Sequence, residues 1–335
     1  MNESDGLTPA AGKMGRVYAP VITPFSEDGG GIDFYAFSAL LGHLSASHVD
    51  GILLLGTNGE FGYLSLEEKW ALIDAVARAD TGLGLMVGAT VPDSREETLR
   101  LAQSLDERLP LPATLLIAPP FYDRYARGGS ATPTEVLSFY RDLLDLQLRI
   151  PIFAYNLPVP DSGPSSAAAS PEFIALLAGS GDLGNFAGVK DSTGNVENIS
   201  AYLAALPEAA IFVGNDHAVS GGIMRGAAGS ITACANLFPS AVQAVWSAAG
   251  DAERRQAQVE LSQLRTVIES IPGKMVGAEK LLLWKLGVLS NRTPLRNAAA
   301  RLSAAEERQL LAALAGVLES LEVNAGLRRV LADAT

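Results

Sequence analysis

Residues 51–80 read GILLLGTNGEFGYLSLEEKWALIDAVARAD. They begin with a continuous apolar run, Gly51 to Leu55, which has the length of a strand. A hydroxyl and a carboxylate three residues apart, Ser65 and Glu68, then open an amphipathic segment, as they do at the start of a helix. An apolar run without alternation is typical of a parallel strand that helices cover on both faces. These residues therefore predict one strand, a connecting loop and one helix.

The same alternation of strand and helix repeats about every thirty residues along the chain. Further helix starts are Ser94 with Glu97, and Thr132 with Glu135. Eight such units predict a (β/α)8 TIM barrel, which takes about 250 residues. A doubly wound sheet is the competing architecture, but no glycine fingerprint follows the first strand. The apolar runs are Val17–Val21, Gly51–Leu55, Gly84–Gly88, Ala113–Ile117, Pro151–Ala154, Phe186–Val189, Ile211–Val213 and Gly229–Thr232.

The strand pattern stops after Asn236, and the rest of the chain reads as helix. We therefore expect an α/β protein made of a TIM barrel with a C-terminal helical extension. The predicted parts are a flexible N-terminal tail over 1–15, the barrel over 16–250 and a helical bundle over 251–335. The predicted C-terminal helices are Pro239–Gly250, Asp251–Ile271, Lys274–Gly287 and Ser303–Asn324.

Composition excludes several classes of function. The 335 residues include 25 Lys and Arg against 37 Asp and Glu, a net charge of −12, which argues against a nucleic acid or an anionic membrane as partner. Cys234 is the single cysteine, so no disulfide can form within the chain. Met1 to Arg16 lack the apolar run of a signal peptide. We expect a cytoplasmic protein.

The residues that end the strands are the candidates for chemistry, because the active site of a TIM barrel lies there. Of the six lysines, only Lys190 directly continues an apolar strand. Desolvation at the barrel mouth would favour its neutral, nucleophilic amine, as Schiff-base catalysis requires. The residues alone also allow an ion pair between Lys190 and Asp191 at the strand end.

Two further strand ends carry polar groups. Tyr155 ends the strand before that of Lys190, and its phenol can relay a proton because it both donates and accepts. The alternative is a half-buried tyrosine packed at the barrel rim. The turn Gly56-Thr-Asn-Gly-Glu60 can hold a carboxylate through the Thr57 hydroxyl and its backbone amides. Its alternative is an ordinary connection, with Glu60 solvated or in a buried hydrogen-bond network.

Metal chemistry has little support in the sequence. The three histidines, His43, His48 and His217, do not form a pair with metal-ligand spacing. We therefore predict no metal site.

With these positions assembled, the chain resembles the family of dihydrodipicolinate synthase and N-acetylneuraminate lyase, the pyruvate-type class I aldolases. The resemblance runs from about Val17 to the C-terminal helices. The motifs that carry it are Val21-Ile-Thr-Pro-Phe25, Gly56-Thr-Asn-Gly-Glu60, Pro119-Pro-Phe-Tyr122, Tyr155-Asn-Leu-Pro158, Gly188-Val-Lys-Asp-Ser-Thr-Gly194 and Gly229-Ser-Ile-Thr232.

The resemblance implies that Lys190 condenses with the ketone of pyruvate or another 2-keto acid. The covalent imine then serves as the electron sink, so neither a cofactor nor a metal is needed. Tyr155 is implied as the proton shuttle, and Thr57 links it to Tyr122. A tyrosine at the position of Tyr122 reaches a neighbouring subunit in this family, so a homotetramer built as a dimer of dimers is implied.

Three further positions are implied to bind substrate. The turn around Thr57, including Asn58 and Gly59, receives the 2-keto carboxylate. Ile231 matches the position whose backbone carbonyl faces the nucleophilic lysine.

One departure from the family bears on the substrate. Synthases of the lysine pathway in this family usually carry an arginine two residues after the proline of the tyrosine motif, where it binds the carboxylate of aspartate semialdehyde. This chain has Pro160 there. Proline cannot form the bidentate pair that arginine makes with a carboxylate. The following segment, Asp161 to Ser170, could then form the site of an uncharged, hydroxylated aldehyde.

We therefore predict a lyase that splits a 2-keto-3-deoxy sugar acid into pyruvate and an aldehyde. The alternatives are a 4-hydroxy-tetrahydrodipicolinate synthase that condenses pyruvate with aspartate semialdehyde, and a related 2-keto acid dehydratase. A non-catalytic reading is a ligand-binding regulatory barrel.

Overall fold

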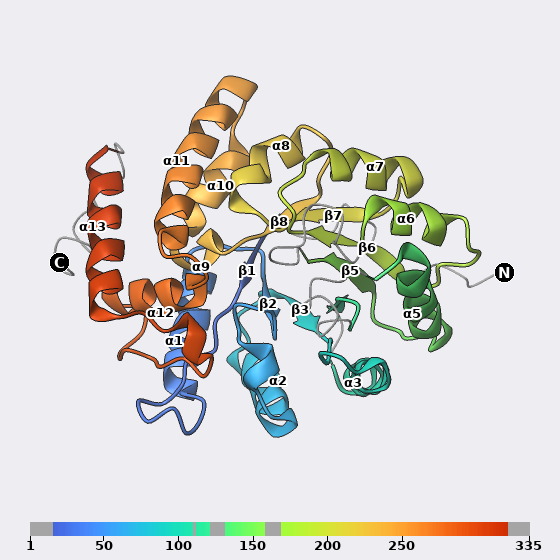
Figure 1. Cartoon of the computed structure of the whole chain (residues 1–335), viewed down its shortest axis with the longest axis horizontal. Coiled ribbons are helices and arrows are strands. Elements are labelled where there is room, and N and C mark those ends of the chain that lie inside the picture. Colours follow the sequence, from blue (N-terminus) through green and yellow to red (C-terminus); the bar gives the residue numbers. More distant parts are fainter. Residues whose placement is uncertain (1–15, 110–111, 121–130, 158–168, 321–335) are drawn as a thin grey trace. The chain divides into compact units, whose positions relative to one another are not determined.

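Parallel strands close into a barrel in the computed structural model, which describes residues 16–109, 112–120, 131–157 and 169–320. The strand order follows the chain from β1 to β8 (Figure 1), which confirms the predicted TIM barrel. The strands are β1 (Val17–Pro20), β2 (Gly51–Leu54), β3 (Gly84–Gly88), β4 (Ala113–Ile117), β5 (Ile152–Asn156), β6 (Phe186–Asp191), β7 (Ala210–Val213) and β8 (Gly229–Ile231).

Helices alternate with these strands and then continue alone towards the C-terminus. The helices are α1 (Phe34–Ala46), α2 (Leu66–Ala79), α3 (Arg95–Arg108), α5 (Pro133–Asp145), α6 (Pro171–Ala178), α7 (Glu197–Ala205), α8 (Val219–Ile223), α9 (Cys234–Leu237), α10 (Pro239–Ser247), α11 (Asp251–Glu269), α12 (Met275–Lys285) and α13 (Ala304–Ser320). Short 3-10 turns are η2 (Phe61–Tyr63), η3 (Asp216–Ala218) and η4 (Ala298–Ala300).

The predicted helix starts are confirmed. Ser65 and Thr132 each accept a hydrogen bond from the backbone N–H three residues on, and the carboxylates of Glu68 and Glu135 bond back to the cap residues. Ser94 caps α3 through its side chain in the same way. Each cap satisfies an N–H group that the first helical turn leaves without a partner.

Two strands run further than their apolar runs predicted. β5 and β6 pair through Tyr155 with Lys190 and through Asn156 with Asp191. An apolar run stops at its first polar residue, whereas the ladder of backbone hydrogen bonds does not depend on side-chain polarity. Lys190 and Tyr155 therefore lie within strands rather than after them, which restricts where their side chains point.

The described chain separates into two compact units. Unit 1 contains Arg16 and the described residues from 84 to 231, and unit 2 contains those from 17 to 83 and from 232 to 320. Strands β3 to β8 belong to unit 1, whereas β1, β2 and the C-terminal helices belong to unit 2.

In unit 1, the strands interlock through alternating large and small residues. A Cβ added at Gly188 would lie 2.6 Å from the Phe153 ring, and one at Gly229 would lie 2.4 Å from the Phe212 ring. The two phenylalanines themselves meet edge to face, with ring centroids 5.6 Å apart. Glycine is therefore required two residues before Lys190, because any larger side chain would displace the strand that carries it.

In unit 2, α9 and α10 pack against β1, and α11 contacts α10, α12 and α13. The apolar stripe of α11 that faces these neighbours is Leu261, Leu264, Val267 and Ile268. Their spacing places them on one face of the helix, which is the pattern of a helix buried on one side.

Two predictions about chain organisation stay open. Residues 1–15, predicted to be a tail, lie outside the described residues. The boundary predicted at residue 250 between barrel and bundle stays a prediction.

Within the described ranges, no helix combines the length and the apolar character that crossing a bilayer requires.

Candidate active site

Lys190 and Tyr155 lie opposite each other on neighbouring strands of unit 1. Lys190 is 4% exposed and Tyr155 is 8% exposed. The Lys190 Nζ atom lies 4.3 Å from the centre of the Tyr155 ring, within the range of a cation–π contact. Among the residues that the structure describes, no carboxylate pairs with Lys190. The strand ends thus bring an amine and a phenol together in a buried place.

The carboxylate of Asp191 is fully engaged elsewhere. Its Oδ1 accepts from the Thr193 N–H at 2.8 Å and the Thr193 hydroxyl at 2.5 Å. Its Oδ2 accepts from Asn156 Nδ2 at 2.8 Å, Asn198 Nδ2 at 2.9 Å and the Tyr202 hydroxyl at 2.7 Å. Successive strand residues point to opposite faces of a sheet, so Asp191 turns away from Lys190. The ion pair that the sequence left open is not formed.

Tyr202 completes this buried network. Burial, and then the negative charge of Asp191, raise the pKa of Tyr202 above its usual value, so the phenol stays protonated and donates to the carboxylate. Asn156 also donates to the Tyr202 oxygen at 2.8 Å and accepts from the Ala169 N–H at 3.0 Å. The network therefore ties the ends of β5 and β6 to Ala169, where the described chain resumes after residue 157.

Tyr202→Phe should lower the free energy of unfolding by about 1–3 kcal/mol, because it removes one hydrogen bond from a buried carboxylate. Urea denaturation measures this change. Tyr140→Phe is the matched control, since Tyr140 is equally buried in unit 1 and its hydroxyl donates to the backbone carbonyl of Ile117. A cost no larger than that of Tyr140→Phe would contradict the special role of the carboxylate.

A hydroxyl contacts the phenol of Tyr155. The Tyr155 hydroxyl lies 3.1 Å from the Ser192 Oγ atom, at hydrogen-bond distance. Gly214 makes room for this serine, since a Cβ at Gly214 would lie 2.0 Å from the same Oγ. The phenol therefore has a partner that can either donate or accept, as a proton shuttle needs.

The Gly56–Glu60 turn of unit 2 exposes backbone donors. Its own hydrogen bonds run from the Gly59 N–H to Gly56 and from the Glu60 N–H to Thr57, both at 3.1 Å. In the described part of the chain, the N–H groups of Thr57 and Asn58 have no hydrogen-bond partner. Two successive free N–H groups suit a carboxylate ligand.

Strain and close packing fix the shape of this turn. Leu55 has a φ of +58° and Glu60 one of +54°, a left-handed conformation that costs free energy in residues other than glycine. The Thr23 hydroxyl donates to the Gly59 carbonyl at 2.7 Å, and a Cβ at Gly59 would lie 3.1 Å from the Val21 carbonyl oxygen. The surrounding structure must therefore hold the turn in place.

Two charged side chains of α12 bind side chains of the Gly56–Glu60 turn. Lys280 Nζ lies 2.6 Å from Glu60 Oε1, and their side chains are 2% and 3% exposed. Asn58 Nδ2 donates to both oxygens of Glu279, at 2.7 and 2.9 Å. The buried network that the sequence offered as one alternative for Glu60 is confirmed. The Asn58 side-chain amide is occupied, which leaves the backbone for a ligand.

The other predicted site residues have simpler placements. Thr57 is exposed on the turn, and Ile231 is the buried last residue of β8. That the Ile231 backbone carbonyl faces the nucleophilic lysine stays a prediction. Tyr122, Pro160 and 161–168 lie outside the described residues. Within the described ranges, no three His, Cys, Asp or Glu side chains gather as metal ligands, and the expected absence of a metal stays a prediction.

Sequence reasoning missed the groups that support the candidate residues. Ser192 belongs to the quoted lysine motif. Its contact with Tyr155 could have been predicted from the pairing register of β5 and β6. Glu279 and Lys280 gave no signal, because they lie on a helix more than 200 residues along the chain from their partners. Only folding brings such pairs together.

Comparison with known proteins identifies the family of the chain. The model of the Dihydrodipicolinate synthetase family matches residues 13–315. A 4-hydroxy-tetrahydrodipicolinate synthase of Synechococcus elongatus is 28% identical over 305 residues, covering 89% of this chain and 94% of that protein. An N-acetylneuraminate lyase of Rhizobium meliloti is 28% identical over 273 residues, covering 81% of this chain and 85% of the relative.

Solved structures share the fold. YagE of E. coli K12, described as a prophage protein of the dihydrodipicolinic acid synthase family in complex with pyruvate, superposes with a TM-score of 0.76 at 22% identity. The match covers 91% of this chain and 98% of that one.

Proposed function

Since the chain belongs to the dihydrodipicolinate synthetase family, whose members are lyases and synthases, we propose that it is a pyruvate-forming carbon–carbon lyase that works through an imine on Lys190. The observation that carries this proposal is the buried Lys190 amine, 4.3 Å from the Tyr155 ring and without a carboxylate partner among the described residues.

The amine must be uncharged to attack a ketone, and an ion pair with a carboxylate would hold it as an ammonium group. Asp191 is the nearest acidic residue in sequence, and its carboxylate accepts hydrogen bonds from other donors. Among the described residues Lys190 therefore has no ion pair, as the proposed nucleophile requires.

The proposed reaction balances without an added reagent. The Lys190 amine adds to the C2 ketone, and loss of water gives a protonated imine. Removal of the C4 hydroxyl proton breaks the C3–C4 bond, releases an aldehyde and passes the electron pair to the imine nitrogen as an enamine. Protonation at C3 and hydrolysis then release pyruvate and restore the amine.

Tyr155 is the proposed carrier of these protons. Its phenol both accepts and donates, and the Ser192 hydroxyl at 3.1 Å gives it a hydrogen-bond partner in either state. The free N–H groups of Thr57 and Asn58 are the proposed site of the 2-keto carboxylate. These assignments agree with those that the family resemblance implies.

The proposed substrate class is a 2-keto-3-deoxy sugar acid. Pro160 replaces the arginine that would bind a second carboxylate, so an uncharged aldehyde fits better than aspartate semialdehyde. The second candidate is the synthase reaction, which is favoured by the name of the Synechococcus relative. A homotetramer is part of the proposal, and light scattering of the purified chain tests it.

Borohydride trapping tests the mechanism. The protein is incubated with pyruvate and borohydride, and peptide mass spectrometry should find a reduced pyruvyl group on Lys190. Trapping on another lysine, or none, would overturn the mechanism. Product analysis then separates the two reactions: glyceraldehyde plus pyruvate should give a sugar acid, while aspartate semialdehyde plus pyruvate should give no product. Binding of pyruvate without adduct or turnover would favour a regulatory barrel.

A further inference from the structure

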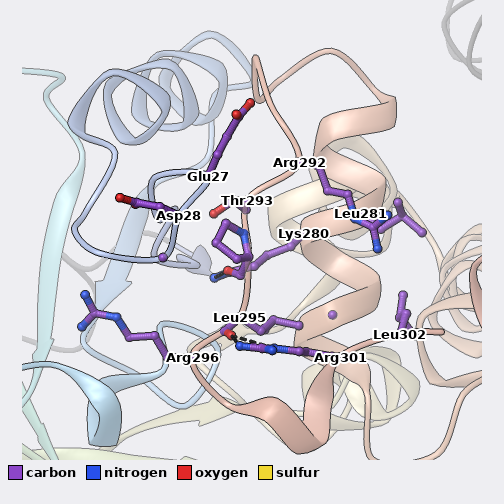
Figure 2. A pocket seen from close by; sticks show the side chains of 13 residues that line it. Glu27, Asp28, Lys280, Leu281, Arg292, Thr293, Leu295, Arg296, Arg301 and Leu302 are labelled. Atoms are coloured by element: carbon purple, nitrogen blue, oxygen red, sulfur yellow. Dashed lines mark hydrogen bonds between the residues drawn. The ribbon is translucent and has the colours of Figure 1, made fainter. Parts of the chain in front are cut away.

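A pocket of about 610 Å³ in unit 2 has no part in the proposed reaction. It lies between the loop at 27–29, the middle of α12, the loop at 292–296 and residues 301–302 (Figure 2). Its volume is within the range of sites for small organic molecules.

The charges that line this pocket are mainly positive. Lys280, Arg292, Arg296 and Arg301 contribute four cations, in a chain whose net charge is −12. The lining also has two acidic residues, but Figure 2 shows the carboxylates of Glu27 and Asp28 pointing away from Lys280 and Arg301. What each cation offers to a ligand depends on whether it already has a carboxylate partner.

Three of these cations are already paired. Lys280 binds Glu60, Arg296 binds both oxygens of Glu68 at 2.6 Å, and Arg292 binds Glu307. These pairs fix the pocket walls and leave little positive charge available for a ligand.

Arg301 is different. Its Nε and Nη2 atoms donate to the Leu295 carbonyl at 3.1 and 3.0 Å, the dashed contact in Figure 2. In the part of the chain that the structure describes, no carboxylate pairs with this guanidinium. A guanidinium has five N–H donors, so about three remain after the two bonds to Leu295. The Leu295 contact holds the group in one orientation, which reduces the entropy lost on binding.

We propose that this pocket binds a small organic molecule with a multiply charged anionic group, held by Arg301. Phosphate esters and polycarboxylates share this chemistry, because both present several oxygens to the planar donors of arginine. The proposal does not depend on the proposed reaction.

Binding at Arg301 would also act on the loop that holds the Gly56–Glu60 turn. The Pro294 carbonyl accepts from Lys280 at 2.9 Å, and the N–H groups of Arg296 and Asn297 donate to Glu60 Oε2 at 3.0 and 2.9 Å. The loop that Arg301 bonds at Leu295 is therefore the same loop that fixes Glu60. A ligand there should stabilise the folded protein in proportion to its affinity.

Titration calorimetry on the full chain tests the site with two probes, fructose 1,6-bisphosphate and citrate, at constant ionic strength. At least one should bind, and Arg301→Gln should weaken it roughly tenfold or more. Arg100→Gln is the matched control, because Arg100 is an exposed arginine of α3 outside the pocket and its loss changes the net charge equally. It should leave the affinity unchanged.

The outcomes are distinct. Binding of the bisphosphate alone identifies phosphate esters as the ligand class, and binding of citrate alone identifies polycarboxylates. Failure of both probes to bind, or equal weakening by Arg301→Gln and Arg100→Gln, overturns the proposal. Thermal unfolding with each probe provides a second measurement, in which the rise in Tm should disappear in Arg301→Gln. None of these results depends on imine formation at Lys190.

Discussion

Lys190→Met should reduce the rate of pyruvate release from a 2-keto-3-deoxy sugar acid by at least about 10³-fold, because it removes the atom that forms the imine. Methionine is also unbranched and apolar, so it fills similar space in the buried site. The rate of pyruvate formation measures the loss. Borohydride trapping with pyruvate should no longer label the protein.

The same variant should keep its stability or gain some. Lys190 is 4% exposed and unpaired with any described carboxylate, so its replacement removes a polar group whose burial costs free energy. Lys285→Met, on α12, is the control and should keep full activity. A Lys190→Met enzyme that turns over at a normal rate would contradict the mechanism. If the Lys190→Met variant is inactive because it is unfolded, the unfolding measurement contradicts the expectation that its stability is kept.

Lys280→Met should lower the free energy of unfolding by about 3–5 kcal/mol at pH 7, since it removes the amine that donates to the Glu60 carboxylate and to the Pro294 carbonyl and leaves the buried Glu60 without this partner. The pair is almost fully buried, with Nζ and Oε1 2.6 Å apart, and Lys280 also lies 4.3 Å above the Phe25 ring. Urea denaturation measures the difference. Lys285→Met, on the same helix but less buried, should change the stability by only about 0.5 kcal/mol. Equal losses in the two variants would contradict the importance of the pair.

The same lysine should make stability depend on pH. Burial lowers the pKa of Lys280 from 10.5 to about 8, although the charge of Glu60 opposes this shift. Between pH 8 and 10.5 the unfolded chain keeps a proton that the folded chain has released, so the free energy of unfolding contributed by this group rises with pH. The stability of the wild-type protein relative to Lys280→Met should therefore increase across this window, by up to about 3 kcal/mol. A difference that stays constant or falls would contradict the lowered pKa.

The fold could be predicted because its signals are local. Each strand of this barrel is a short apolar run such as Gly51 to Leu55, and caps such as Ser65 with Glu68 satisfy backbone groups only a few residues away. When a unit of strand and helix repeats, the connection rules allow few topologies for the sheet. The polar ends of β5 and β6 were harder to predict, because ladder hydrogen bonds continue past the last apolar side chain.

The sequence by itself determined the barrel, its eight strands and the candidate pair of Lys190 and Tyr155, because these follow from hydrophobic pattern, short-range capping and quoted motifs. Only the tertiary structure decided that Asp191 bonds Tyr202 instead of Lys190, and that Lys280 and Arg301 flank the loop that fixes Glu60. The physical reason is that ion pairs and hydrogen bonds depend on distance in space and not on distance along the sequence. Residues as far apart as Glu60 and Lys280 become neighbours only after the chain has folded.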